Sequence, residues 1–259
     1  MAPSPREEWQ LDTRRLGRRV LVFDQVGSTN TQAAALAENQ GNDGIVLLAD
    51  EQTAGRGQHG RTWTCPAGVG VLLSVLIFPP ERLRRPVILA AWAAHSVCET
   101  IEQITGMQAR IKWPNDVLVR GRKVCGILIE QARGTVVGIG LNVNQSAQAL
   151  EDAGLPHAGS LAFFSGGLLD RQQVARQLIM QLDEEYDRLC QGDLATLEAC
   201  WKWRTGLLEQ HVIIECQDGP HRGRLLEISW DGLELQYAHG EVTRLLPETI
   251  KHVTVLSAE

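Results

Sequence analysis

The chain has 259 residues, which at about 150 residues per domain corresponds to one large domain or to a large domain with a small one. Hydrophobic residues make up 44% of the chain and charged residues 22%, which excludes a disordered chain and a collagen-like repeat. The net charge of −6 is uneven, because residues 206–259 hold nine acids and only four bases. We therefore expect residues 206–259 to form a unit distinct from residues 1–205.

Several other classes of protein are not expected. No basic face is evident, which argues against general nucleic-acid binding. The longest apolar stretch, residues 67–78, has about twelve residues, and a transmembrane helix needs about 20. The first 19 residues lack the apolar core of a secretory signal, and three acids among them argue against a transit peptide. The six cysteines form no CxxC pair and the seven histidines show no metal spacing, so we expect reduced thiols in a cytoplasmic protein and no metal ligands.

The hydrophobic pattern predicts strands mixed with helices as far as residue 205. The first strand, at 19–24, precedes a helix that Ser28 or Thr29 would cap. Six further strands are predicted at 45–49, 71–78, 110–113, 117–119, 124–130 and 135–143. Three further helices are predicted at 86–106, 170–190 and 194–203, with a loop over 145–168. After Gly206, strands at 212–216, 224–229 and 233–237 are separated by turns, which is typical of a small β-barrel.

A glycine-rich loop follows the second strand. Residues 55–60 read GRGQHG and satisfy the pattern G-x-G-x-x-G. A dinucleotide-binding fold is not favoured, because no helix follows the loop and no acid lies about 20 residues on. One interpretation is a mobile surface loop. The more specific interpretation is a loop that closes over a phosphate. Arg56 and Arg61 lie among three glycines, which would allow the backbone to approach the phosphate closely.

Lysine is scarce in this chain. Only four of the 25 basic residues are lysines, and two of them, Lys112 and Lys123, lie within twelve residues. A predicted hairpin between them would return Lys123 beside Lys112. Two exposed lysines on a turn are the simpler interpretation, but an ammonium is a compact charge that suits an oxygen shared between a carboxylate and a phosphate.

Five strings of residues together resemble the biotin–protein ligases, also called biotin–[acetyl-CoA-carboxylase] ligases. These strings are GSTN (27–30), QTAGRGQHGRTW (52–63), KWPNDVLV (112–119), GRKVCGILIE (121–130) and GIGLNVN (138–144). The resemblance runs from about residue 19 to the end of the chain. It implies an α+β fold, in which a mixed β-sheet with packed helices, similar to the core of class II aminoacyl-tRNA synthetases, forms a catalytic domain over 1–205. A small SH3-like β-barrel would occupy 206–259.

The resemblance also implies a reaction. Such enzymes use ATP, with Mg²⁺, to convert biotin to biotinyl-5′-AMP, and then transfer biotin to one lysine of a biotin carboxyl carrier protein, such as a subunit of acetyl-CoA carboxylase. The residues that match catalytic positions are Arg56, Lys112, Asp116 and Lys123. Asp116 would orient or deprotonate the incoming lysine, or else cap a turn.

The binding positions follow from the same motifs. The residues that match biotin-binding positions are Ser28, Thr29, Asn30, Gln52, Arg56, Gly57, Gln58, Lys123 and Gly126. The residues that match ATP-binding positions are Gly55, Arg56, Gly57, Arg61, Trp63, Asn115, Lys123 and Asn142. Asn115, Asp116 and Asn142 would lie near the nucleotide or its Mg²⁺. No residue is expected to hold a metal ion directly as a resident cofactor.

Gln58 departs from the family, whose members often carry arginine there, so we expect faster loss of the adenylate. Only about 18 residues precede the first predicted strand, where some relatives carry a DNA-binding domain, so we expect no DNA partner. We expect a monomer or a homodimer that binds no membrane. Two alternatives are a lipoate–protein ligase with the same acyl-adenylate chemistry and a non-catalytic protein that binds biotin or the carrier.

Overall fold

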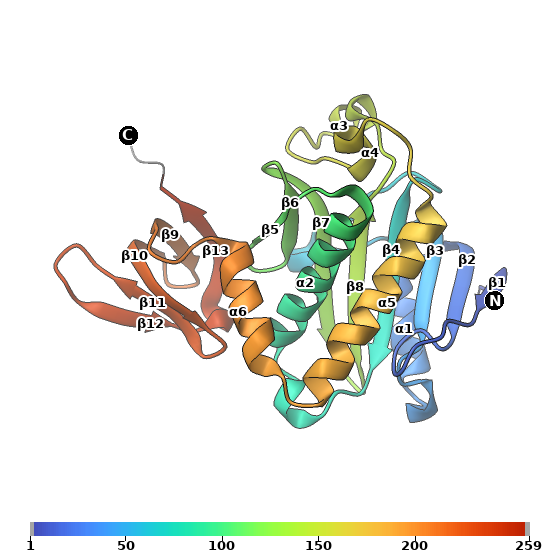
Figure 1. Ribbon diagram of the computed structural model, residues 1–259, viewed down its shortest axis with the longest axis horizontal. Helices are drawn as coiled ribbons and strands as arrows, with labels where there is room; N and C mark the ends of the chain where they lie inside the picture. Colours follow the sequence, from blue (N-terminus) through green and yellow to red (C-terminus); the bar gives the residue numbers. More distant parts are fainter. Residues whose placement is uncertain (1–2, 257–259) are drawn as a thin grey trace.

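A computed structural model describes residues 3–256 (Figure 1). Its larger sheet has eight strands in the order β1-β2-β3-β4-β8-β7-β6-β5, and β2 and β3 run parallel while the other neighbours are antiparallel. The mixed sheet predicted from the sequence is thereby confirmed. The strands are β1 (Glu7–Trp9), β2 (Val20–Val26), β3 (Val46–Gln52), β4 (Gly70–Ile77), β5 (Ala109–Lys112), β6 (Asp116–Val119), β7 (Arg122–Gln131) and β8 (Thr135–Asn142).

Helices cover the two faces of this sheet unequally. The α-helices are α1 (Thr29–Leu36), α2 (Pro86–Thr105), α3 (Ala147–Asp152), α4 (Leu161–Ser165), α5 (Arg171–Cys190) and α6 (Leu194–Thr205). Short 3₁₀ turns span Gln40–Asn42, Gln58–Gly60, Glu81–Leu83 and Pro247–Thr249. The long helices α2 and α5 lie side by side across one face (Figure 1). The short helix α1 packs on β3, β4 and β8 from the other face, and it leaves part of that face for the site described below.

Strand alternation explains the two layers. Val46 and Leu48 of β3 belong to the core beneath α2 and α5, whereas Leu47 and Ala49 belong to a smaller core beneath α1. Successive side chains of a strand point to opposite faces, so a strand buried on both faces reads as a continuous apolar run. This is why residues 45–49 and 71–78 were correctly expected to be strands.

The helix ends are set by local signals. Pro86 starts α2, and Gly106 ends it in the left-handed conformation with φ of 69°, as predicted. Asp170 caps α5 by accepting bonds from the backbone N–H groups of Gln172 and Gln173, also as predicted. The expected cap of α1 was wrong, because no side chain caps that helix. Ser28 occupies the N-cap position without bonding the helix, and the Thr29 hydroxyl bonds to Gln52 instead.

The loop expected over 145–168 contains two short helices, α3 and α4. Each begins with a serine whose hydroxyl accepts a backbone N–H: Ser146 caps α3 and Ser160 caps α4. These caps were readable in the sequence, but the helices are only six and five residues long. A helix this short leaves little apolar periodicity to detect.

The last part of the described chain forms a second, antiparallel sheet with the strand order β12-β11-β10-β9-β13. Its strands are β9 (His211–Cys216), β10 (Pro220–Ser229), β11 (Gly232–Gln236), β12 (Val242–Leu245) and β13 (Ile250–Val255). Three of the five were predicted, and the sheet agrees with the expected SH3-like unit. Trp201 of α6 stacks on Trp230, with ring centroids 4.8 Å apart, and so joins this sheet to the larger domain. Within residues 3–256, none of the helices has both the length and the apolar character that a bilayer crossing requires.

A buried charged network ties α6 to α2 and β5. The Arg204 guanidinium is 2% exposed and donates to the carboxylates of Glu99 and Glu102 and to the carbonyl of Ala109. Its Nε also donates to His95 Nδ1 at 3.2 Å, so this ring nitrogen must be unprotonated. Burial, together with the Arg204 charge, lowers the pKa of His95 from 6.5 to about 4.

This arrangement predicts a loss of stability in mild acid. The unfolded chain protonates His95 below about pH 6.5, whereas the folded protein does not until about pH 4. The contribution of His95 to the free energy of unfolding is therefore complete above pH 6.5 and is lost as the pH falls toward 4. We expect a loss of about 2 kcal/mol between pH 6.5 and pH 5. Urea unfolding of the natural protein and His95→Gln across this range tests this, with His59→Gln as the exposed control. Equal pH slopes for all three proteins would refute it.

Candidate active site

The site lies on the face of the larger sheet that α1 leaves partly open. Gly138 and Gly140 of β8 lie on this face, because Ile139 and Leu141, which alternate with them along the strand, pack into the opposite core. Gly126 of β7 is paired with Gly140. Three neighbouring glycines remove the side chains that would otherwise fill the space, and a cavity of about 330 Å³ lies over them.

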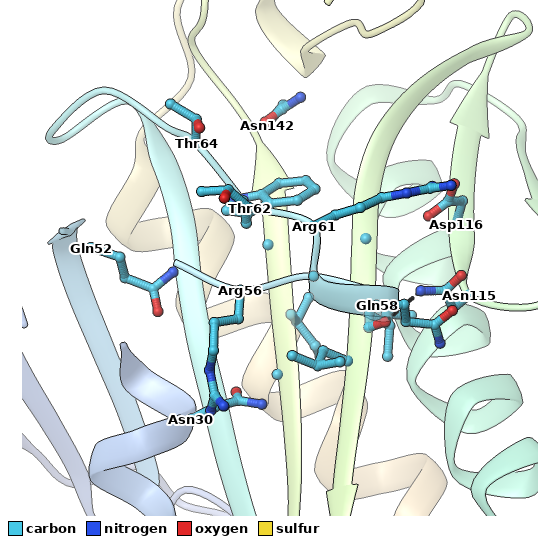
Figure 2. Close-up of a pocket in the computed structure, with 18 of the residues that line it drawn as sticks. Asn30, Gln52, Arg56, Gln58, Arg61, Thr62, Thr64, Asn115, Asp116 and Asn142 are labelled. Carbon is cyan, nitrogen blue, oxygen red and sulfur yellow. Dashed lines mark hydrogen bonds between the residues drawn. The ribbon is translucent and has the colours of Figure 1, made fainter. Parts of the chain in front are cut away.

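Hydroxyl and amide groups line one side of the cavity. The Gln52 amide oxygen accepts bonds from the Thr29 backbone N–H at 2.7 Å and from its hydroxyl at 3.0 Å. The Ser74 hydroxyl, buried in β4, bonds to Thr29 Oγ1 at 2.7 Å and to Asn30 Oδ1 at 2.5 Å. These bonds hold Asn30 and Gln52 at the cavity wall (Figure 2). Because the Gln52 oxygen is engaged, its amide nitrogen is the end available to a ligand.

The loop between β3 and β4 covers the cavity. Bonds within the loop fix its shape: the Gly57 N–H donates to the Arg61 carbonyl (2.7 Å) and the Trp63 N–H donates to the Gly55 carbonyl (3.1 Å). Gly55 lies against the Trp63 carbonyl so closely that a Cβ there would collide with it. Arg56 turns down from the loop toward Asn30 (Figure 2), and both side chains bond to the same oxygen of Glu130 at 2.8 Å. His59, at the centre of the 3₁₀ turn of this loop, is exposed to solvent.

The other side of the cavity is charged. The Lys123 ammonium of β7 lies 2.6 Å from the Asp116 carboxylate of β6, and both are partly exposed. The Trp63 ring packs on Gly126 and Gly140, and Lys123 Nζ lies 5.7 Å from its centroid. Arg61 reaches across the cavity toward Asp116 (Figure 2). Within the described residues, the buried Trp63 indole N–H has no hydrogen-bond partner.

The segment 153–159 completes the wall above Lys123. The Lys123 N–H donates to the His157 carbonyl at 3.0 Å, and the Gly159 N–H donates to the Lys123 carbonyl at 2.8 Å. Asn142 uses its amide N–H on the Gly159 carbonyl and its oxygen on Gln145, each at 3.0 Å. The Asn115 amide likewise donates to the Ile127 carbonyl at 2.6 Å. Both asparagines therefore position the cavity wall as well as lining it.

The structure brings together nearly all the residues that the sequence singled out. Those that line the cavity are Ser28, Thr29, Asn30, Gln52, Arg56, Gly57, Gln58, Arg61, Trp63, Asn115, Asp116, Lys123, Gly126 and Asn142. Gly55 instead supports the loop from beneath Trp63. Lys112 lies elsewhere. In the β5–β6 hairpin Lys112 pairs with Asp116, whereas in the β6–β7 hairpin Lys123 pairs with Leu118. Lys112 lines a separate hollow between β5 and β13.

Sequence reasoning missed four residues that shape the cavity: Ser74, Glu130, Gly138 and Gly140. Three of them lie in strings that were quoted for other residues, and strand alternation would have placed them on the face of Gly126. Ser74 is the one polar residue in the apolar run of β4. A lone hydroxyl in a buried strand signals an internal hydrogen bond, because burying it unpaired is costly.

Comparisons with known proteins agree with this geometry. The model of the Biotin/lipoate A/B protein ligase family matches residues 22–145. The chain is 31% identical over 231 residues to the bifunctional ligase/repressor BirA of Bacillus subtilis, covering 87% of this chain and 71% of that protein. It is 38% identical over 174 residues to the biotin--[acetyl-CoA-carboxylase] ligase of Mycobacterium tuberculosis, covering 64% of this chain and 63% of that one.

The fold has a counterpart among solved structures. The biotin protein ligase from Aquifex aeolicus in complex with biotin and ATP superposes with a TM-score of 0.78 at 26% identity, covering 92% of this chain and 99% of that chain. The shared fold and the ligases among its relatives define an enzyme of the ligase class. The chain belongs to the biotin/lipoate A/B protein ligase family and, within it, to the biotin protein ligases.

Proposed function

We propose that this protein activates biotin with ATP to give biotinyl-5′-AMP and pyrophosphate, and then transfers biotin to a lysine of a carboxyl carrier protein. The observation that carries the proposal is a single cavity with amide and hydroxyl groups along one side and, on the other, the ion pair of Lys123 with Asp116, toward which Arg61 reaches. Biotin has a matching asymmetry, with a neutral ureido ring at one end and a carboxylate at the other. The solved relative named above, whose cavity belongs to the same fold, is described as a complex with biotin and ATP.

The side of the cavity lined by hydroxyl and amide groups suits biotin better than lipoate. A ureido group offers one carbonyl and two N–H groups, which Ser28, Asn30 and Gln52 can satisfy. The dithiolane ring of lipoate has no such groups, so these buried side chains would lose hydrogen bonds to water without gaining any from the ligand. This asymmetry favours biotin over the lipoate ligase alternative.

In the first step, a carboxylate oxygen of biotin attacks the α-phosphorus of ATP. A new O–P bond forms, and the bond to the β-phosphate oxygen breaks as pyrophosphate leaves with the electron pair. Two anions must meet, and Lys123 and Arg61 offset their repulsion. Arg56, whose charge is shared with Glu130 in this structure, can turn to the developing charge when ligands fill the cavity.

In the second step, the carrier lysine attacks the carbonyl of the mixed anhydride, an amide bond forms, and AMP leaves. The attacking amine must be neutral, so its proton needs an acceptor. Asp116 lines the cavity, and its ion pair at 2.6 Å keeps it beside Lys123, the lysine proposed to contact the anhydride. It can orient the amine or take its proton.

Mg²⁺ would arrive with ATP as part of the substrate. It prefers oxygen ligands, and it usually keeps several waters beside one or two carboxylates and the phosphates. Asp116 and the side-chain oxygen of Asn115 offer such groups at the cavity.

The direct test is to incubate the protein with ATP, Mg²⁺, biotin and a biotin carrier domain, and to probe the carrier for biotin. We expect labelling that requires ATP. A parallel reaction with lipoate and a lipoyl domain is expected to give none. Labelling with lipoate alone would favour the lipoate ligase alternative. Stoichiometric biotin binding without labelling would favour a non-catalytic protein.

Gln58 provides a further prediction. It lines the cavity from the 3₁₀ turn of the loop, and its amide carries no charge to hold the adenylate phosphate. Gln58→Arg is expected to slow release of biotinyl-5′-AMP about tenfold or more, because a hydrogen bond to a charged group is worth about 1.5–3 kcal/mol. Release of radiolabelled adenylate after rapid dilution measures this.

His59→Arg is the matched control for Gln58→Arg. It adds the same charge one residue away, on a side chain that is exposed and does not line the cavity. We expect the control to leave the release rate near that of the natural protein. Equal release rates for Gln58→Arg and the natural protein would contradict the role given to Gln58.

A further inference from the structure

The hairpin that joins β9 to β10 brings together three side chains that take no part in the ligase site. Cys216 is the last residue of β9, Asp218 lies in the turn, and His221 is the second residue of β10. One ligand atom from each, a thiol sulfur, a carboxylate oxygen and a ring nitrogen, lies within 4.8 Å of the other two. Within residues 3–256, this is the one group of three metal-ligating side chains that converges in this way.

The backbone of the turn holds this arrangement. The Cys216 N–H donates to the Gly219 carbonyl at 3.0 Å, which closes the turn. Gly219 has a φ of 133°, a conformation that side-chain-bearing residues rarely adopt. Cys216 is 5% exposed and faces the interior, whereas Asp218 is exposed. The cluster is therefore anchored on its sulfur side and open to solvent on its carboxylate side.

The imidazole of His221 is already oriented for binding. Its Nδ1 lies 2.6 Å from the Tyr237 hydroxyl, and its Nε2 lies 3.3 Å from Asp218 Oδ1. Metal-bound histidines usually bond through their second nitrogen to a polar partner, which fixes the tautomer and the plane of the ring. Tyr237 can be this partner, because its hydroxyl can accept a hydrogen bond from the Nδ1–H group while Nε2 faces Asp218.

We propose that Cys216, Asp218 and His221 bind one divalent cation of the zinc type, with water as a fourth ligand. Zinc accepts sulfur, nitrogen and oxygen ligands in tetrahedral geometry, whereas Mg²⁺ and Ca²⁺ prefer oxygen alone. The ligand atoms of such a site lie about 3.5 Å apart. The His221–Asp218 pair already meets this spacing, and the exposed turn lets the other pairs close by about 1 Å.

Binding of a divalent cation at the proposed site also balances in charge and in protons. Burial raises the pKa of the Cys216 thiol, so without a cation it is protonated at neutral pH. Binding releases this proton to solvent, and the thiolate and the carboxylate then neutralise the two charges of the ion. The ion would link β9 to β10 and, through Tyr237, to the end of β11. It would thus stabilise the C-terminal sheet, independently of the proposed ligase chemistry.

The test uses the untagged full-length protein, stripped with a chelator and titrated with Co²⁺. We expect one ion per chain, a thiolate-to-cobalt charge-transfer band and the visible bands of four-coordinate Co²⁺, all removed by competing Zn²⁺. Elemental analysis after dialysis against Zn²⁺ should give the same stoichiometry. Absence of stoichiometric binding of either ion would overturn the proposal.

Variants identify the ligands. Cys216→Ser is expected to abolish the charge-transfer band, and His221→Asn to weaken binding at least tenfold. The control Cys200→Ser changes a half-buried thiol in α6 and should bind like the natural protein. Tyr237→Phe keeps all three ligands and is expected to raise the Kd about tenfold. The Kd of Tyr237→Phe therefore tests the proposed site even if Cys216→Ser fails to fold. A charge-transfer band that survives Cys216→Ser, or an unchanged Kd in Tyr237→Phe, would refute the site.

Discussion

Lys123→Ala is expected to lower the rate of adenylate formation by about 10²–10³-fold, while the protein stays folded. Lys123 lines the cavity and is not buried in the core. The substitution therefore removes a positioned charge at little structural cost. One preorganised contact to developing charge is worth about 2.7–4 kcal/mol in the transition state. Pyrophosphate release with biotin and ATP, followed in a single turnover, measures the effect.

The matched control for Lys123→Ala is Lys251→Ala. Lys251 is an exposed lysine of β13, outside the cavity, and its removal changes the net charge by the same amount. We expect the control to react within about twofold of the natural protein. A Lys123→Ala rate that also stays within about threefold would show that Lys123 does not stabilise the reacting phosphate, and the mechanism proposed above would fail.

Gly138→Ala is expected to raise the KM for biotin by about one to two powers of ten. A Cβ on Gly138 would collide with the Asn30 amide, which is held by bonds from Ser74 and to Glu130. Asn30 must then move, and each buried polar group left unpaired costs about 1–3 kcal/mol. We expect the KM for ATP to change much less, because Asn30 lies on the side of the cavity away from Asp116 (Figure 2).

Gly167→Ala is the control for this substitution. A Cβ there meets nothing within 4 Å, so the same chemical change should leave the KM values and the thermal stability as they are. In Gly138→Ala, Asn30→Ala should restore thermal stability by removing the clash, but it should not restore biotin affinity. A folded Gly138→Ala protein with an unchanged KM for biotin would show that Asn30 does not hold the ring.

The elements that the sequence predicted well are those whose signal is local. The helix α2 begins at Pro86 and ends at Gly106, and α5 begins after Asp170, because proline, glycine and aspartate act on the nearest turn of backbone. Strand β1 was missed. It has three residues, and it exists because its backbone pairs with β2.

The active site also has features that the local sequence predicts and features that depend on the pairing of distant segments. The motifs predicted which residues line the cavity, because residue type and spacing are visible in the chain. They did not show that Lys112 lies outside it, since this depends on the registers of the β5–β6 and β6–β7 hairpins, the second of which shifts between Val117 and Leu118. They also did not show that Glu130 joins Arg56 to Asn30, because these three residues come from a strand, a loop and a helix far apart in the sequence.

The sequence by itself thus determined the family, the mixed character of the sheet, the extent of the long helices and most of the cavity-lining residues. Only the tertiary structure decided which side chains touch. It placed Ser74 between Thr29 and Asn30, and it brought Cys216, Asp218 and His221 together around a turn. The physical reason is that capping and alternation act over a few residues, whereas strand pairing between distant segments sets the partners across a sheet.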